Sequence, residues 1–196
     1  MDRVRYDTKT ALLVVDVQND FADPKGSLYV EEGEKVVPVI NREIEIARAA
    51  GALVVYTQDW HPDVTPHFQK YGGVWPVHCV RGSWGASFAP ELRVEGEVVR
   101  KGTGAEDGYS GFSVADVQTG IRKPTELESL LRSHGVERVV IIGLATDYCV
   151  KETALEALRI GFVTTVLREG IRAVNLKESD GERALEEIRQ AGALVE

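Results

Sequence analysis

The sequence predicts an α/β protein, a three-layer α/β/α sandwich whose mostly parallel sheet has about six strands. Short β-rich runs alternate with helical patterns along the chain, which is typical of a parallel sheet covered by helices on both faces. The 196 residues are the length of one domain, and 43% hydrophobic with 28% charged residues is a globular composition. We therefore expect one domain over residues 1–196.

Five runs rich in β-branched and other apolar residues predict the strands, and a sixth run is weaker. The five are 11–15, 52–57, 97–100, 138–142 and 162–167, and the weaker one is 193–195. None of them approaches the roughly 18 apolar residues of a membrane span.

Helical spacing of apolar residues predicts four helices between these strands. They cover 34–50, 125–135, 147–160 and 179–191, and a glycine ends each of the first three. Capping boxes, Thr125 with Glu128 and Ser179 with Glu182, predict the starts of the second and fourth helices.

Two long segments, 61–90 and 102–124, interrupt this alternation, and each begins just after a strand. Loops of that length in a compact domain are usually functional. Open parallel sheets bind ligands at the carboxyl ends of their strands. We therefore expect the functional site at this edge of the sheet.

Charge and cysteine content limit the partners. Lys and Arg number 23 against 31 Asp and Glu, a net charge of −8, so we expect no nucleic-acid partner and no attraction to anionic membranes. The first seven residues carry both signs of charge and fit neither a signal nor a transit peptide. Two cysteines are too few for a disulfide scaffold, which predicts reduced thiols in a cytoplasmic protein.

Three strand ends deliver the parts of an activated thiol: Asp16, Lys101 and Cys149. Taken singly, Asp16 could be a turn former, Lys101 a solvated strand end and Cys149 a small buried apolar residue. Together they suit acyl transfer, with Asp16 as proton acceptor and donor and Lys101 stabilising a thiolate. A position in the first helical turn predicts a lowered pKa for Cys149, and the backbone N–H groups of Ala145 and Cys149 could form an oxyanion hole.

A metal site is predicted beside this thiol. Asp59 and His61 lie two residues apart in an extended segment and can chelate one ion, with His78 completing the set. One carboxylate and two imidazoles suit Zn²⁺, Fe²⁺ or Mn²⁺. His67 could be a further metal ligand or could orient a bound water. The other interpretation is a loop with incidental polar residues.

Aromatic residues near these positions could hold a flat substrate ring. Phe21 follows the first strand, Trp75 lies in the histidine-rich loop and Tyr148 precedes the thiol. Core packing is the alternative for these rings, and Cys79, beside His78, is interpreted as packing.

These segments resemble those of the nicotinamidases among the isochorismatase-like cysteine hydrolases. The resemblance covers most of the chain. It rests on the blocks Asp16-Val17-Gln18-Asn19-Asp20-Phe21, Asp59-Trp60-His61-Pro62, Trp75-Pro76-Val77-His78-Cys79, Lys101-Gly102, Asp107-Gly108-Tyr109-Ser110-Gly111-Phe112 and Ala145-Thr146-Asp147-Tyr148-Cys149-Val150. Residues 113–124 match no functional block.

The resemblance implies a Cys149, Asp16 and Lys101 triad, a divalent metal held by Asp59, His61 and His78, and a cis peptide between Leu144 and Ala145. It implies hydrolysis of nicotinamide in NAD salvage, with pyrazinamide as a further substrate, and is compatible with a homo-oligomer. Three alternatives stay open: a related hydrolase of another small amide or ureido compound, a metallohydrolase that uses metal-bound water, and a catalytically inactive binding protein.

Overall fold

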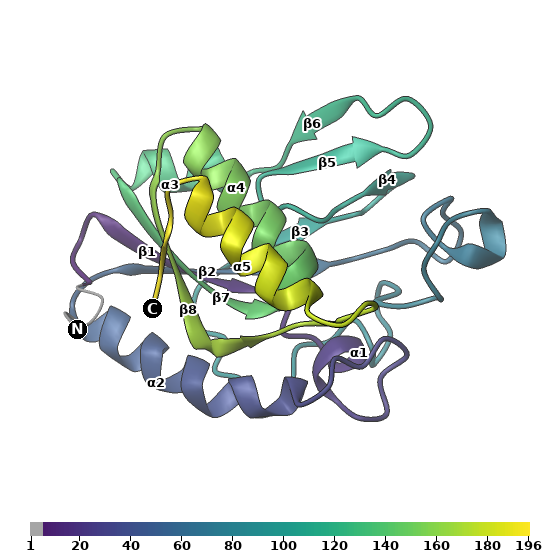
Figure 1. Ribbon diagram of the computed structural model, residues 1–196, viewed down its shortest axis with the longest axis horizontal. Helices are drawn as coiled ribbons and strands as arrows, with labels where there is room; N and C mark the ends of the chain where they lie inside the picture. The colour runs from purple at the N-terminus through teal and green to yellow at the C-terminus, as the bar shows by residue number, and fades with distance from the viewer. Residues whose placement is uncertain (1–5) are drawn as a thin grey trace.

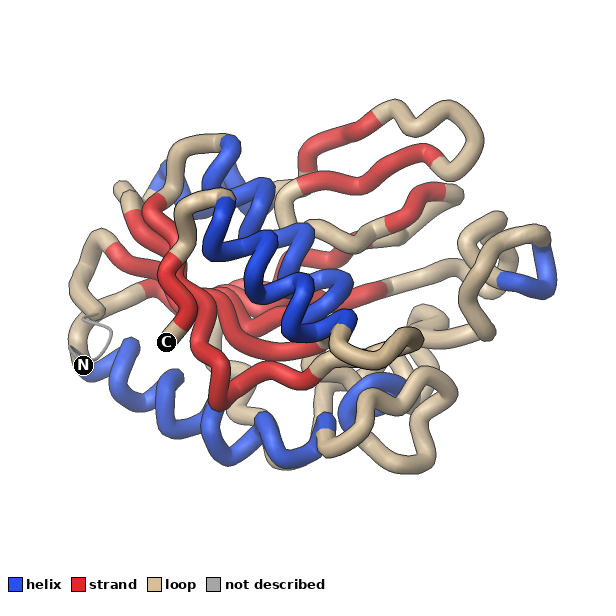
Figure 2. The backbone as a smooth tube through the Cα atoms, in the orientation of Figure 1, coloured by secondary structure: helices blue, strands red, loops and turns tan. Residues whose placement is uncertain are grey.

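The computed structural model describes residues 6–196. Of the first seven residues, which are predicted to be neither a signal nor a transit peptide, residues 1–5 lie outside the described range. Helices on both sides enclose a central sheet (Figures 1 and 2), which confirms the predicted sandwich. Within the described range, no helix is both long enough and apolar enough to cross a membrane.

The central sheet has six strands in the order β3-β2-β1-β7-β8-β9, and every neighbouring pair is parallel. The strands are β1 (Thr10–Val15), β2 (Leu53–Asp59), β3 (Glu97–Lys101), β7 (Arg138–Leu144), β8 (Val163–Arg172) and β9 (Leu194–Val195). All six predicted strands are present. β8 runs further than predicted, and its register against β7 shifts between Ile141 and Gly143.

Two apolar cores lie on the two faces of this sheet. All of β1 is buried, and its side chains alternate between the cores: Leu13 and Val15 face one, Leu12 and Val14 the other. Helix α2 (Val36–Ala49) covers the second face, and α3 (Leu127–Ser133), α4 (Lys151–Arg159) and α5 (Asp180–Gln190) cover the first. Covering on both faces explains why β1 is an unbroken apolar run.

Short helical pieces occur at the sheet edge where the loops gather. They are α1 (Asn19–Ala22), the 3₁₀ turns η1 (Gly33–Lys35) and η2 (Gln69–Tyr71), and the π-helical turn η3 (Thr146–Val150). The predicted helix 147–160 therefore begins with a π-helical turn, and α-helical geometry starts only at Lys151.

The predicted capping boxes are wrong in detail. Ser179 has a left-handed backbone (φ 67°) and makes no capping hydrogen bond; instead, Asn175 Oδ1 accepts from the Gly181 N–H at 2.8 Å. Thr125 does accept from the Leu127 N–H at 3.2 Å, but its hydroxyl also donates to Gly111 O. At the start of α5 an asparagine six residues upstream of Gly181 therefore takes the place of Ser179, whereas Thr125 keeps a local acceptor role and adds a contact with Gly111.

The sequence predicted a loop over residues 102–124, but part of this segment forms strands. It contains a small antiparallel sheet of β4 (Glu106–Asp107), β5 (Ser113–Asp116) and β6 (Arg122–Pro124), seen beside the central sheet in Figure 1. Its strands are too short and too polar to show an alternating pattern. Contacts with α4 hold it: the Gly111 N–H donates to Thr153 Oγ1 at 3.0 Å and the Ser113 hydroxyl to Glu156 Oε2 at 2.7 Å.

Candidate active site

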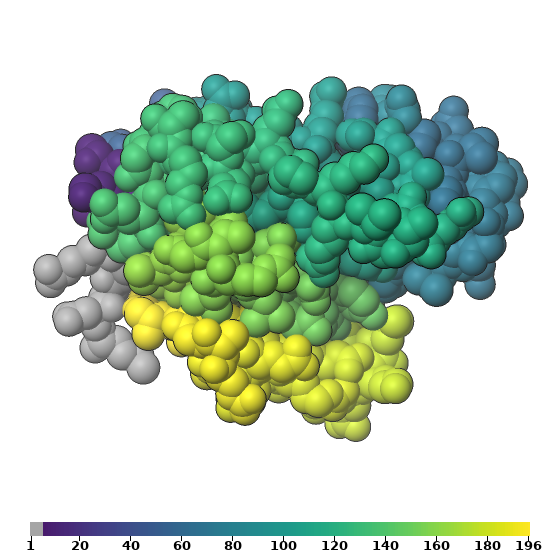
Figure 3. Space-filling model, turned by 90° about the horizontal axis from the view of Figure 1, so that it is seen from above, coloured from purple at the N-terminus to yellow at the C-terminus, as the bar shows by residue number. Residues whose placement is uncertain are grey.

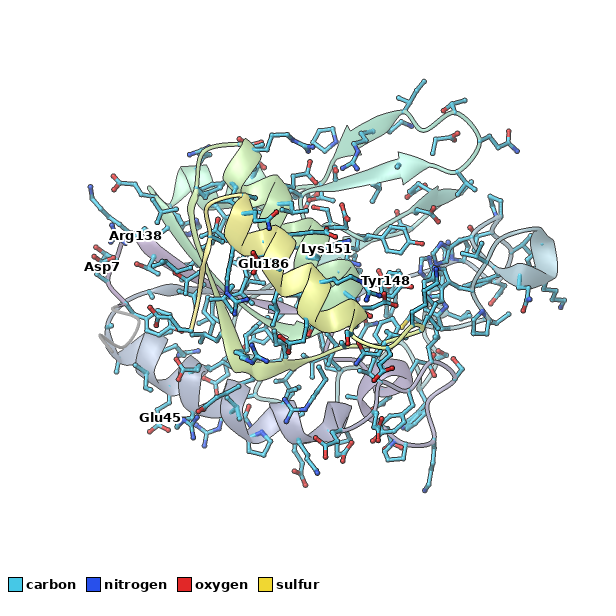
Figure 4. The ribbon with its side chains drawn as sticks, in the orientation of Figure 1. Asp7, Glu45, Arg138, Tyr148, Lys151 and Glu186 are labelled. Carbon is cyan, nitrogen blue, oxygen red and sulfur yellow. The ribbon has the colours of Figure 1, made fainter. Side chains whose placement is uncertain are left out.

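The predicted site residues converge at the carboxyl ends of four adjacent strands. Asp16 directly follows β1, Asp59 and Lys101 end β2 and β3 and pair in the sheet register, and Cys149 lies in η3 after β7. Figure 4 shows the neighbouring Tyr148 at this end of the sheet, with Arg138, at the start of β7, at the opposite end. Residues distant in sequence are thus neighbours in space because parallel strands end at one edge.

Asp16, Lys101 and Cys149 form one buried contact group. The Lys101 ammonium lies 2.8 Å from Asp16 Oδ2 and 3.7 Å from Cys149 Sγ. One carboxylate oxygen of Asp16 lies within 4.8 Å of Cys149 Sγ. Thr57 donates its hydroxyl hydrogen to Asp16 Oδ1 at 2.7 Å, which fixes the orientation of this carboxylate.

Lys101 is the electrostatic centre of the group. Its side chain is fully buried and also donates to Asp59 Oδ1 at 2.5 Å and to Gly108 O. Burial disfavours the charged amine, but the carboxylates of Asp16 and Asp59 outweigh it and raise the pKa of Lys101. The amine therefore stays protonated. Because an ammonium ion lies among Asp16, Asp59 and Cys149, this acidic cluster is unsuited to a metal cation.

Burial also sets the protonation of the two reacting groups. It raises the pKa of Asp16, although Lys101 opposes the shift. It raises the pKa of the Cys149 thiol as well, again against the effect of Lys101 and with the carboxylates of Asp16 and Asp59 contributing. The predicted lowering of the thiol pKa is therefore wrong: desolvation and two nearby anions outweigh the start of the helix.

Three imidazoles gather beside this group. The rings of His61, His67 and His78 lie 4.6 to 5.2 Å apart between centroids, and one nitrogen of each lies within 4.8 Å of one nitrogen of the others. All three side chains are buried. The sequence left the role of His67 open, and the structure places it in this cluster with the other two.

The outer nitrogen of each ring is already engaged. His61 Nδ1 lies 3.0 Å from Gly102 O and His78 Nδ1 lies 2.8 Å from Pro76 O. A carbonyl oxygen can only accept, so each Nδ1 carries the hydrogen and each Nε2 has a free lone pair. Within residues 6–196, His61 Nε2 is buried without a hydrogen-bond partner. An orphaned imidazole nitrogen facing two more imidazoles fits a divalent cation that prefers nitrogen ligands.

Asp59 connects the imidazoles to the thiol group. Its Oδ2 lies 3.7 Å from His61 Nε2, while its Oδ1 accepts from Lys101. Burial disfavours the charged carboxylate, but the Lys101 ammonium outweighs it and holds the pKa of Asp59 well below its ordinary value. Burial lowers the pKa of His78 to about 4, so its imidazole is neutral at neutral pH and can act as a ligand.

A pocket lies over both groups and has mostly apolar walls. Its lining includes Phe21, Leu28, Val30, Asp59, His61, His67, Trp75, His78, Gly108, Tyr109, Leu144, Ala145, Tyr148, Cys149 and Val174. The three aromatic residues predicted to contact substrate, Phe21, Trp75 and Tyr148, all line this pocket. Trp75 and Tyr148 meet edge to face at 5.0 Å, and Phe21 lies 5.6 Å from His78 between ring centroids.

Sequence reasoning missed several residues of this pocket. Tyr109, whose hydroxyl accepts from Trp75 Nε1 at 2.7 Å, was recognised only as part of the block 107–112, and Leu28, Val30 and Val174 were not singled out. Val174 is positioned by Asp147, whose Oδ1 accepts from its N–H at 2.9 Å. Val174 lies just beyond the end of β8, and the sequence did not predict that this strand extends to Arg172, which explains the omission. The peptide bond between Leu144 and Ala145 is cis, as the resemblance implied.

The chain matches the Isochorismatase domain family over residues 10–196. It belongs to the isochorismatase family. Within this family it is 39% identical over 203 residues to the nicotinamidase of Escherichia coli, an alignment that covers 94% of this chain and 93% of the relative.

Solved structures of isochorismatase-family relatives agree. The pyrazinamidase of Pyrococcus horikoshii in complex with zinc is 41% identical with a TM-score of 0.84, and the match covers 96% of this chain and 98% of that one. PnC1 from L. infantum in complex with nicotinate is 34% identical with a TM-score of 0.87, covering 98% and 95%. The family and the fold are therefore shown by sequence and by structure together.

Proposed function

We propose that this protein hydrolyses nicotinamide to nicotinate and ammonia through a thioester on Cys149. The observation that carries the proposal is that Cys149 and the three imidazoles line one pocket. Behind the Cys149 sulfur lies Lys101, which in turn contacts Asp16. Similarity to nicotinamidases and to a nicotinate complex supports the substrate class.

The first half-reaction follows from the buried contacts. Asp16 accepts the thiol proton, and Lys101, 3.7 Å from the sulfur, stabilises the thiolate as it forms. The thiolate attacks the amide carbon, and the backbone N–H groups of Ala145 and Cys149 stabilise the oxyanion. Asp16 then donates its proton to the departing ammonia, a transfer for which its raised pKa suits it.

The second half-reaction regenerates the thiol. A water molecule, deprotonated by Asp16, attacks the thioester carbonyl, and the proton returns to the Cys149 sulfur as nicotinate leaves. Fixed partners keep Asp16 in place through both steps, since Thr57 and Lys101 each contact one of its two oxygens.

His61, His67 and His78, with Asp59 Oδ2 beside them, would hold a divalent metal, for which we propose Zn²⁺, with Fe²⁺ and Mn²⁺ as alternatives. A cation held there would supply a Lewis-acidic centre for the ring nitrogen, and this contact would orient the substrate. Phe21, Trp75 and Tyr148 would contact the flat ring. Pyrazinamide also has a ring nitrogen meta to its carboxamide and is therefore proposed as a second substrate.

Ammonia release from a panel of amides tests the proposal. We expect turnover of nicotinamide and pyrazinamide, and much slower turnover of benzamide, which has the carboxamide but no ring nitrogen. Inactivity on the two heterocyclic amides, with Zn²⁺ present, would contradict the proposal and favour a binding protein. Faster turnover of a ureido compound would instead favour another amidase of the family.

The nucleophile is tested separately. Cys149→Ala is expected to abolish turnover, and mass spectrometry of enzyme quenched during turnover is expected to show an acyl adduct on Cys149. Residual activity of Cys149→Ala near the wild-type rate, or the absence of the adduct on a turning-over enzyme, would favour metal-bound water as the nucleophile.

A further inference from the structure

We infer that Asp107 is a positioning residue for the metal site and acts through His67; this rests on the proposed metal centre. The carboxylate Oδ1 of Asp107 is hydrogen bonded to His67 Nδ1. Among residues 6–196, this carboxylate is the one side-chain acceptor bonded to an Nδ1 of the three imidazoles, since His61 and His78 donate from Nδ1 to the backbone carbonyls of Gly102 and Pro76.

The need for this partner follows from where His67 lies. His61 lies two residues after the end of β2 and pairs with Val80 as an isolated bridge, whereas His67 belongs to the irregular part of the loop 61–90. Its own backbone N–H is held only locally, by Thr65 Oγ1 at 3.3 Å. A side-chain anchor from another segment therefore contributes to fixing this ring.

Asp107 can fix both the tautomer and the basicity of His67. A carboxylate acceptor keeps the hydrogen on Nδ1, which leaves Nε2 free to face His61 and His78. A negative partner also makes the ligating nitrogen more basic than a neutral carbonyl would. The pair is largely shielded from water, because the His67 side chain is 4% exposed and that of Asp107 28%.

The residues that follow Asp107 contact the other parts of the site. Gly108 O accepts from the Lys101 ammonium, and the Tyr109 hydroxyl accepts from Trp75 Nε1. Three consecutive residues, 107–109, thus contact the imidazole cluster, the triad and the aromatic wall of the pocket. Figure 3 shows the teal surface of this part of the chain next to the blue surface of the preceding loop, in agreement with the contacts of Asp107 with His67 and of Tyr109 with Trp75.

Space restricts what else this segment could do. A Cβ at Gly108 would meet the Gly102 nitrogen at 2.9 Å and Lys101 side-chain carbons at 3.3 Å. The chain therefore passes close to Lys101 at this point. A displacement of residues 107–109 would disturb the position of Lys101 in the triad. Loss of the Asp107 contact is expected to loosen His67 first, because Gly108 and Tyr109 keep their own partners.

Zinc affinity, measured by competition with a chromogenic chelator, tests the inference without reference to turnover. Asp107→Ala removes the acceptor and is expected to weaken Zn²⁺ binding about 10- to 100-fold, the effect typical of losing such an outer partner. Asp107→Asn keeps an acceptor oxygen without the charge and is expected to lie between Asp107→Ala and the wild type. Asp116→Ala is the matched control, because Asp116 lies on the same small sheet and, in the part of the chain that the structure describes, its carboxylate bonds only to the Thr119 hydroxyl and the Gln118 and Thr119 N–H groups.

The outcomes separate this inference from the proposed function. If the wild type binds one Zn²⁺ tightly and Asp107→Ala binds it within a factor of two, the role of Asp107 is refuted while the metal centre stands. If the wild type itself binds no Zn²⁺, the metal centre fails and the inference fails with it. If circular dichroism shows Asp107→Ala to be unfolded, the same criterion is applied to Asp107→Asn.

Discussion

Replacing Lys101 with methionine tests the electrostatic account of the site most directly. Lys101→Met keeps most of the side-chain volume but removes the ammonium that contacts Asp16 at 2.8 Å and Asp59 at 2.5 Å. Both carboxylates are then buried without their cation. Removing one partner of a buried ion pair costs about 3–5 kcal/mol of unfolding free energy at neutral pH, and we expect a loss of this size.

The pH dependence gives the sign of the effect. In the wild type the pKa of Asp59 is lowered, so its ionisation stabilises the folded state above the ordinary pKa. In Lys101→Met burial and mutual repulsion raise the pKa of both carboxylates, so the folded state retains protons that the unfolded chain has released. Its stability then falls as the pH rises, and the deficit against wild type is largest at neutral pH and shrinks toward acid.

Urea unfolding at about pH 7.5 and about pH 4.5 measures this deficit. Both proteins are first treated with chelator, because Asp59 adjoins the imidazole cluster. Lys123→Met, a change of an exposed lysine on β6, is the control and is expected to stay within about 0.5 kcal/mol of wild type. A deficit below about 1 kcal/mol at the higher pH, or one as large in acid, would refute the reasoning.

Three further predictions concern the pocket and its proton transfers. Because Asp16 must be ionised to accept the thiol proton, kcat/KM for nicotinamide should fall as the pH drops through its raised pKa; an acid limb at or below pH 3.8 would contradict this. Tyr109→Phe removes the hydroxyl that accepts from the Trp75 indole N–H. The KM for nicotinamide should then rise about fivefold, equivalent to about 1 kcal/mol, while kcat is unchanged. An unchanged KM would count against a role of this contact in binding. Asp147→Ala removes the acceptor of two backbone N–H groups, Val174 among them, and should cost about 3 kcal/mol in chemical denaturation; a loss under about 1 kcal/mol would show that water replaces them.

The sequence alone was enough to predict the sheet and the edge of it that matters. β1 and β7 are largely apolar runs because helices cover both faces, and such runs can be recognised without knowing what covers them. Parallel strands all end at one edge, so Asp16, Asp59, Lys101 and Cys149 could be grouped from their positions after strands. The chemistry of those residue types then indicated an activated thiol beside imidazole ligands.

The tertiary structure decided everything that depends on the surroundings of a side chain. The sequence predicts Cys149 in the first turn of a helix, where the pKa of a thiol is lowered. Its pKa is instead raised because the thiol is buried beside two carboxylates that other strands supply. His67 lies in the imidazole cluster, and its outer nitrogen bonds to Asp107, 40 residues away. Desolvation and long-range hydrogen bonds exist only after folding, so a pattern of residue types predicts which groups meet but not their charge states or their anchors.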